Sequence, residues 1–302
     1  MIIPPYLKPG DTIALAAPAR KISAEEIAPA VALLELKGFK VLVHDSLFGV
    51  DNQLSGSDEE RAGSIIELLK NEDVKAILFA RGGYGSIRTV EHIPQELFAE
   101  HPKWLVGYSD VTVFHNLMSK LGIQSIHGTM PINFPKDGTE NSSISSLVDT
   151  LMGRGTKVSA APHHLNIKGE AKGILTGGNL SVLYSLAGTP LDTIPEGRIL
   201  FIEDLDEYLY HIDRMMMNLK ASGKLSKIAG LVVGGMNDMR DNAIPWGHSA
   251  YDTICDIMKG YDIPVAYGFP VGHQEPNLAM VMGATVELQV TDSGASLVYT
   301  NA

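Results

Sequence analysis

The chain has 302 residues, 45% hydrophobic and 20% charged, which is the composition of a globular protein long enough to form two cores. Its formal net charge of −11 would repel phosphate backbones, so we expect no nucleic-acid partner. A single cysteine, Cys255, excludes an intrachain disulfide, and we find neither a signal peptide nor an apolar run of membrane-spanning length, so we expect a cytoplasmic protein with no membrane partner.

Residues 1–135 alternate apolar, strand-like runs with amphipathic helical stretches. Ser23 and Glu26 are spaced for a capping box at the start of the first helix. Strands are expected at residues 11–18, 40–44, 74–80, 104–106 and 124–127. This alternation predicts an N-terminal α/β domain with a doubly wound, flavodoxin-like parallel sheet and helices on both faces.

Residues 136–168 lack periodicity and are rich in Gly, Ser, Thr, Pro and His, so we predict a linker with one short helix near 144–151. A second domain, α+β or β-rich, is predicted over residues 169–302. In it Gly177-Gly178-Asn179 opens a helix, and Asp292-Ser293-Gly294 is typical of a hairpin turn. Its strands are expected at residues 198–202, 228–233, 264–267, 284–290 and 295–300.

Ser109 is the candidate nucleophile of the first domain. An apolar run turns at Gly107 and helical spacing begins at Val111, so the serine lies between a strand and a helix. Such a turn exposes the hydroxyl and directs the following backbone N–H groups outward. The match to the G-x-S-x-G elbow is partial, because Val111 occupies the place of the second glycine. The alternative is that Ser109 only caps the helix.

Candidate partners for this serine follow strands of the second domain. Glu203 follows the strand at 198–202, and His273 follows Gly268-Phe269-Pro270-Val271-Gly272. A serine, a histidine that moves its proton and a carboxylate that orients the histidine are the groups needed for nucleophilic acyl transfer. In the alternative interpretation Glu203 pairs with a nearby arginine and His273 caps a turn.

The loop at residues 81–86 directly follows the strand at 74–80. Gly82, Gly83 and Gly85 lack the G-x-G-x-x-G spacing, so no dinucleotide cofactor is expected. Adjacent glycines do let backbone N–H groups approach a ligand closely, which suits an oxyanion site. His163-His164 has no companion ligands at metal-binding spacing, so we expect no metal and no cofactor.

Five short motifs occur in one order along the chain. They are Arg81-Gly82-Gly83-Tyr84-Gly85, Gly107-Tyr108-Ser109-Asp110-Val111-Thr112, Gly177-Gly178-Asn179-Leu180, Phe201-Ile202-Glu203-Asp204 and Gly268-Phe269-Pro270-Val271-Gly272-His273. Together they resemble the LD-carboxypeptidase family of serine peptidases, which includes microcin-immunity peptidases, over nearly the whole chain. One departure is Thr129, where proline is more usual.

The resemblance implies a catalytic triad of Ser109, Glu203 and His273 that is split between two domains. It implies an oxyanion hole formed by Gly83 and Asp110, with Gly82 as a further candidate. The implied reaction is hydrolysis of the amide between the L-centre of a diamino acid and the terminal D-alanine of a muropeptide tetrapeptide. A homodimer is also implied.

Three residues are candidates for binding the substrate: Arg81, Tyr84 and Asn179. A peptide that ends in D-alanine has a free carboxylate beside the scissile bond, and arginine binds carboxylates through a bidentate fork. Arg81, beside the loop glycines, is our candidate for this contact. The alternative, of equal weight, is that Arg81 forms an ion pair with a nearby acidic residue and stabilises the loop.

Two other functions stay open at this point. One is a microcin-immunity-type hydrolase of peptidyl- or aminoacyl-nucleotide conjugates, but residues 128–169 contain only Phe134 as an aromatic residue to stack on a base. The other is a non-catalytic two-domain protein that binds a ligand.

Overall fold

In a computed structural model, which describes residues 1–155 and 157–300, the chain divides into two compact units. Unit 1 comprises Met1–Gly155 and Leu278–Gly283, and unit 2 comprises Thr156–Asn277 and Ala284–Ala302. This division differs from the predicted one at 136–168, because the predicted linker is shared between the units. Its helix α6 (Ser142–Leu151) belongs to unit 1, and its strand β6 (Lys157–Ala160) joins the sheet of unit 2.

Unit 1 is built on a six-stranded sheet. Across the sheet the order is β2 (Lys40–Val43), β1 (Thr12–Ala16), β3 (Val74–Phe79), β4 (Trp104–Gly107), β5 (Ser125–His127) and β11 (Met280–Met282). The first five strands are parallel, and β11 pairs antiparallel with β5. The order 2-1-3-4-5 is that of flavodoxin-like sheets, which confirms the predicted fold class. The edge strand β11 was not predicted.

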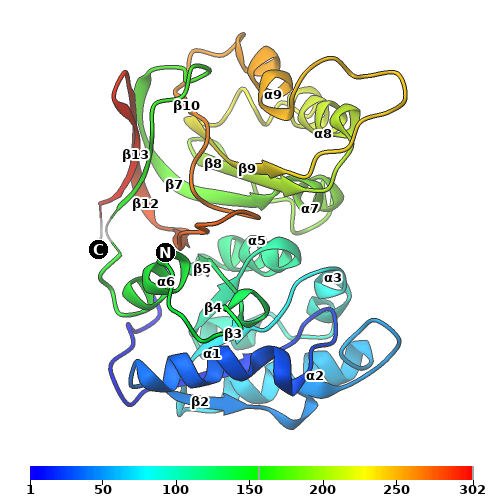
Figure 1. Ribbon diagram of the computed structural model, residues 1–302, viewed down its shortest axis with the longest axis vertical. Coiled ribbons are helices and arrows are strands. Elements are labelled where there is room, and N and C mark those ends of the chain that lie inside the picture. The colour runs from blue at the N-terminus through cyan, green and yellow to red at the C-terminus, as the bar shows by residue number, and fades with distance from the viewer. Residues whose placement is uncertain (156, 301–302) are drawn as a thin grey trace. The chain divides into compact units, whose positions relative to one another are not determined.

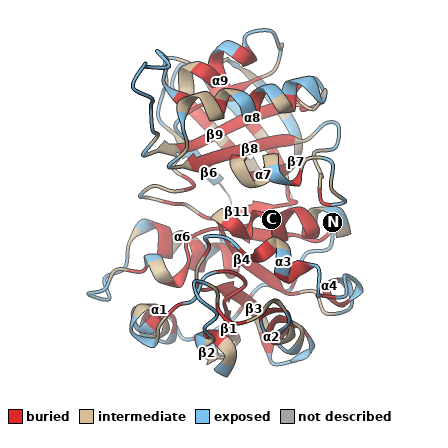
Figure 2. Ribbon diagram, turned by 90° about the vertical axis from the view of Figure 1, so that its right-hand side faces the viewer, coloured by how far each residue is buried: buried red, intermediate tan, exposed pale blue. Residues whose placement is uncertain are grey.

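Helices cover both faces of this sheet. They are α1 (Ala24–Leu36), α2 (Asp58–Lys70), α3 (Ser86–Val90), α4 (Glu96–Glu100), α5 (Thr112–Leu121) and α6. Figure 2 shows α1 and α6 on one side of the strands and α2, α3 and α4 on the other. The predicted capping box begins α1, since the backbone N–H of Glu26 donates to Ser23 Oγ and that of Ser23 donates to the Glu26 carboxylate.

Unit 2 contains a seven-stranded mixed sheet. Across the sheet the order is β10 (Val265–Ala266), β9 (Gly230–Asn237), β8 (Ile199–Leu205), β7 (Gly169–Asn179), β12 (Thr285–Thr291), β13 (Gly294–Tyr299) and β6. The strands from β10 to β7 are parallel, and those from β7 to β6 are antiparallel. The predicted hairpin is confirmed, with Asp292 and Ser293 between the paired residues Thr291 and Gly294.

The parallel half of the unit 2 sheet supports three helices. They are α7 (Leu180–Leu186), α8 (Leu209–Ala221) and α9 (Ala250–Met258), and Figure 1 shows α8 and α9 lying together beside β8 and β9. Buried side chains of these helices and strands, among them Ile202, Met215 and Ile254, form one continuous apolar cluster. This packing gives the carboxyl ends of β8 and β9 a rigid base.

Among the residues that the structure describes, no helix combines the length and the apolar character that crossing a membrane requires.

Candidate active site

Ser109 lies on a strained turn between β4 and α5. Its backbone φ is +63°, a left-handed value that L-residues other than Asn and Asp rarely adopt. A short 3-10 turn (Ser109–Val111) leads into α5, whose N-cap is Val111, so Ser109 does not cap this helix. Strain of this kind occurs at nucleophile elbows, where it holds the hydroxyl clear of the sheet. The strand-turn-helix context predicted for Ser109 is therefore confirmed.

Val111 packs where an elbow would have its second glycine. A Cβ atom built on Gly107 would lie 2.9 Å from Val111 Cγ2, which is closer than real Cβ contacts. Because the Val111 side chain fills this space, residue 107 must be glycine. The turn therefore tolerates valine in place of the second glycine of the elbow pattern.

The loop after β3 lies directly against Ser109. A Cβ atom on Gly82 would be 3.0 Å from Ser109 Cβ, 3.2 Å from Ser109 Oγ and 3.5 Å from the backbone nitrogen of Asp110. Gly83, at φ +109°, has the side chain of Arg20 at 2.5 Å from its own Cβ position. Of the predicted oxyanion residues, Gly82 therefore lies against Ser109 and the Asp110 nitrogen, whereas Gly83 packs against Arg20. An oxyanion role for the three residues stays a prediction.

The Asp110 side chain ties the two loops together. It is buried, and its carboxylate accepts a hydrogen bond of 2.8 Å from the backbone N–H of Ser86, the first residue of α3. Burial raises the pKa of Asp110, although the Ser86 N–H group acts against this shift. Behind it the buried Arg61 donates to the carbonyl oxygens of Pro18 and Gly85. These contacts hold the glycine loop in place.

His115 holds the strand end that leads into the turn, a role that sequence analysis did not assign. Its Nε2 lies 2.9 Å from the carbonyl oxygen of Gly107, and its Nδ1 lies 2.8 Å from Ser125 Oγ. A carbonyl only accepts, so Nε2 carries the proton and Nδ1 accepts from the serine hydroxyl. The only signal in the sequence is a polar residue among the apolar positions Val113, Phe114, Leu117 and Met118.

The burial of His115 predicts that the folded state loses stability in acid. Burial lowers its pKa to about 4, from 6.5 when exposed, so between these values the unfolded chain binds the proton and the folded chain does not. Unit 1 is expected to lose about 3 kcal/mol of unfolding free energy as the pH falls through this window. Urea unfolding at pH 7 and pH 4.5 measures the loss, which His115→Gln should reduce strongly. The exposed His248→Gln serves as the control, and an equal loss in both variants contradicts the assignment.

In unit 2, the buried Glu203 forms a hydrogen-bonded pair with the half-buried His273. Glu203 has no exposed surface, and its Oε2 accepts from His273 Nδ1 at 2.7 Å and from the His273 backbone N–H at 3.1 Å. A carboxylate accepts, so Nδ1 carries the proton and Nε2 has the lone pair in the neutral ring. Burial lowers the pKa of His273, but the charge and hydrogen bond of Glu203, together with Asp204, outweigh it and leave the pKa raised.

The His273 loop is held by close backbone contacts. A Cβ atom on Gly272, at φ +96°, would be 2.7 Å from Glu203 Cβ, Cγ and Oε2. Asn237 Nδ2 at the end of β9 donates to the His273 carbonyl at 2.6 Å, and Gly235 N–H donates to Val271 O at 3.0 Å. The loop can therefore reach the Glu203 carboxylate only with glycine at 272.

Asn179 and Asp204 support the neighbouring strand ends. Asn179 caps α7, and its Nδ2 donates to Asp204 Oδ1 at 2.9 Å, while the Ser181 N–H group donates to Asp204 Oδ2 at 2.8 Å. Burial and then the charge of Glu203 raise the pKa of Asp204 to about 7. A role for Asn179 in binding substrate stays a prediction, and its side chain is already engaged within unit 2.

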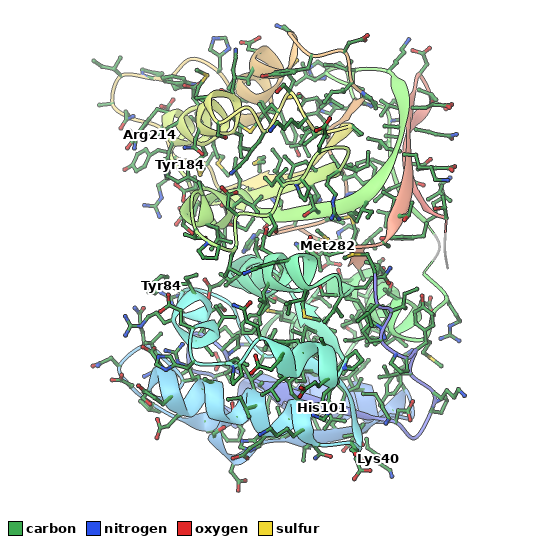
Figure 3. All side chains as sticks on the ribbon, turned by 180° about the vertical axis from the view of Figure 1, so that it is seen from behind. Lys40, Tyr84, His101, Tyr184, Arg214 and Met282 are labelled. Atoms are coloured by element: carbon green, nitrogen blue, oxygen red, sulfur yellow. The ribbon has the colours of Figure 1, made fainter. Side chains whose placement is uncertain are left out.

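The other two predicted binding residues lie on the glycine loop of unit 1. Arg81 Nη1 is 3.4 Å from the Lys21 carbonyl oxygen and 3.6 Å from Glu26 Oε1, a loose contact with its side chain one-third exposed. Tyr84 is 55% exposed and projects outward in Figure 3. Their contact with a substrate stays a prediction. Within the described residues, no group of three or more His, Cys, Asp or Glu side chains is arranged to hold a metal ion.

Comparison with known proteins covers both halves of the chain. The LD-carboxypeptidase N-terminal domain matches residues 13–128, and the LD-carboxypeptidase C-terminal domain matches residues 172–288. A Bacillus subtilis protein named "Probable murein peptide carboxypeptidase" is 33% identical over 97% of this chain and 93% of its own. The microcin C7 self-immunity protein MccF of Escherichia coli is 25% identical over 95% of this chain and 93% of its own.

Among solved structures, the muramoyltetrapeptide carboxypeptidase of Oxalobacter formigenes is similar with a TM-score of 0.86 and 29% identity, over 95% of this chain and 97% of that one. The two halves of the chain thus match the two domains of one family, in the same order and over almost the full length. The chain belongs to the LD-carboxypeptidase family of peptidases.

Proposed function

We propose that the protein is a serine LD-carboxypeptidase that removes the terminal D-alanine from muropeptide tetrapeptides. The observation that carries the proposal is the strained Ser109 at the end of β4, with the Gly82 backbone against it. The family of the chain and the names of its relatives, a murein peptide carboxypeptidase and a muramoyltetrapeptide carboxypeptidase, support the substrate class.

In the proposed reaction Ser109 Oγ attacks the carbonyl carbon of the diamino acid. His273 Nε2 takes the hydroxyl proton, while Glu203 keeps the other proton on Nδ1 and stabilises the imidazolium. Backbone N–H groups of Gly82 or Gly83 and of Asp110 stabilise the oxyanion. The C–N bond breaks, His273 returns the proton to the leaving D-alanine nitrogen, and an ester on Ser109 remains. Water, deprotonated by His273, then attacks the ester carbon. The bond from that carbon to Ser109 Oγ breaks, His273 returns the proton to Oγ, and the shortened peptide leaves.

Mass spectrometry of a tetrapeptide digest tests this function. We expect loss of one alanine from the carboxyl end, unchanged by a metal chelator, and labelling of Ser109 by a fluorophosphonate probe. An unlabelled Ser109 with an unchanged peptide would instead indicate a binding protein. Faster turnover of a peptidyl-adenylate analogue than of the tetrapeptide would indicate the immunity-type activity.

A homodimer and a cytoplasmic location belong to the proposal as well. Sedimentation velocity of the purified chain measures the first, with a species of twice the chain mass expected. Cell fractionation measures the second, with the protein expected in the fraction that also holds cytoplasmic markers.

A further inference from the structure

A cavity of about 570 Å³ opens in unit 1 beside the glycine loop. Its wall includes Lys21, Ile22, Glu26, Phe48, Val50 and Arg81. The proposed reaction does not use this cavity, although Arg81 directly precedes Gly82, whose backbone lies against Ser109.

The cavity lies at the point in the sheet where ligands are expected. Its residues follow the carboxyl ends of β1, β2 and β3, and Ser109 follows the carboxyl end of β4. The chain leaves β1 toward α1 on one face of the sheet and leaves β3 toward α3 on the other (Figure 2). This divergence between β1 and β3 is the topological switch point, where open α/β sheets form a binding crevice.

The wall of the cavity combines positive charge with apolar surface. Lys21 and Arg81 are cationic, and among the described residues the Lys21 ammonium forms no ion pair. The single acid in the wall, Glu26, accepts from the Ser23 N–H group at 2.8 Å through its Oε2, and its Oε1 lies 3.6 Å from Arg81 Nη1. One positive charge of the wall thus remains in excess. Phe48 and Val50 are 38% and 68% exposed. In a chain of net charge −11, a wall with excess positive charge beside apolar side chains suits a carboxylate next to an aliphatic chain.

The size of the cavity decides which part of a peptide it suits. A volume of about 570 Å³ lies within the roughly 300–1,000 Å³ range of sites for whole small ligands, far more than one alanine requires. An extended peptide advances roughly 3.3–3.6 Å per residue, so a segment attached at Ser109 reaches past Arg81 within a few residues.

We propose that this cavity is the subsite for the acyl side of the substrate peptide, and that Lys21 and Arg81 bind a carboxylate carried there. The inference rests on the proposed function. It assigns Arg81 to the acyl side of the scissile bond, where sequence analysis predicted a contact with the terminal carboxylate.

The test compares wild type with Lys21→Glu on three peptides: the tetrapeptide, a form with an acyl-side carboxylate amidated, and a form with the terminal carboxylate amidated. On the tetrapeptide, Lys21→Glu is expected to raise KM about tenfold or more with little change in kcat, because a charge-assisted contact is replaced by repulsion. Acyl-side amidation should raise the wild-type KM similarly and remove the difference between the two proteins. Terminal amidation should leave that difference intact.

Lys40→Glu is the matched control, because this substitution changes the net charge by the same amount. Lys40 is exposed at the amino end of β2, whereas the cavity residues follow the carboxyl end of that strand. Figure 3 shows Lys40 and Tyr84 at opposite sides of unit 1. An unchanged KM in Lys21→Glu, or a difference removed by terminal amidation, overturns the subsite. Calorimetric titration of the tripeptide product into wild type and Lys21→Glu separates the two proposals. Equal affinity of the two proteins for the tripeptide rejects the subsite. A wild-type protein that releases no alanine from the tetrapeptide rejects the proposed function instead.

Discussion

Ser109→Ala is expected to lower kcat/KM on the tetrapeptide by several orders of magnitude, leaving roughly 10³–10⁴-fold over the uncatalysed reaction from binding and the oxyanion donors. In the proposed reaction the Ser109 hydroxyl forms the new bond to the substrate, and no neighbouring group can replace it. Ser109→Gly should be equally inactive. Single-turnover assays with product detection by mass spectrometry measure both variants.

The same two variants separate chemistry from backbone strain. At φ +63° alanine retains the steric cost of the left-handed conformation and glycine does not, so Ser109→Gly should be more stable than Ser109→Ala by about 1 kcal/mol. Urea unfolding measures the difference. Near-normal turnover in Ser109→Ala would refute the nucleophile, and equal stability of the two variants would refute the strained turn.

Glu203→Gln is expected to lower kcat/KM by about 10³–10⁴-fold at neutral pH. The carboxylate accepts from both the Nδ1–H and the backbone N–H of His273, and an amide in its place offers a donor that favours the wrong tautomer. Glu203 also raises the pKa of His273, and in the proposed reaction His273 must be neutral to take the serine proton. The wild-type kcat/KM should therefore fall as the pH drops through a value above 6.5. In Glu203→Gln this acidic limb of the pH–rate profile should lie at lower pH.

A second glutamate–histidine pair provides the control. Glu67 Oε2 lies 2.9 Å from His44 Nε2 on unit 1, and Glu67→Gln removes the same charge from a pair with no proposed role in the reaction. Its pH–rate profile should match that of wild type. If Glu203→Gln keeps the wild-type acidic limb, the group that titrates in the rate is not His273.

Local sequence was sufficient for the elements that carry Ser109. Apolar periodicity and the Ser23–Glu26 spacing are readable within windows of a few residues, and they predicted the strand and helix alternation from which the parallel sheet follows. The turn at Gly107 was likewise readable, because the change from strand to helical spacing occurs around the serine itself. Strand β11 was not, since three residues, Met280–Met282, have no periodicity of their own.

Contacts between distant segments were decided only by tertiary structure. Glu203 and His273 are 70 positions apart, and their hydrogen bond depends on Gly272 letting the loop approach to where any Cβ atom would collide with the glutamate. The approach of Gly82 to Ser109 and the hydrogen bond from Ser86 to Asp110 arise in the same way, from close packing of separate loops. The sequence by itself determined which residue types stand at the strand ends, because periodicity and turn chemistry are local. Their distances and protonation were set by packing and burial, which depend on residues far away in the chain.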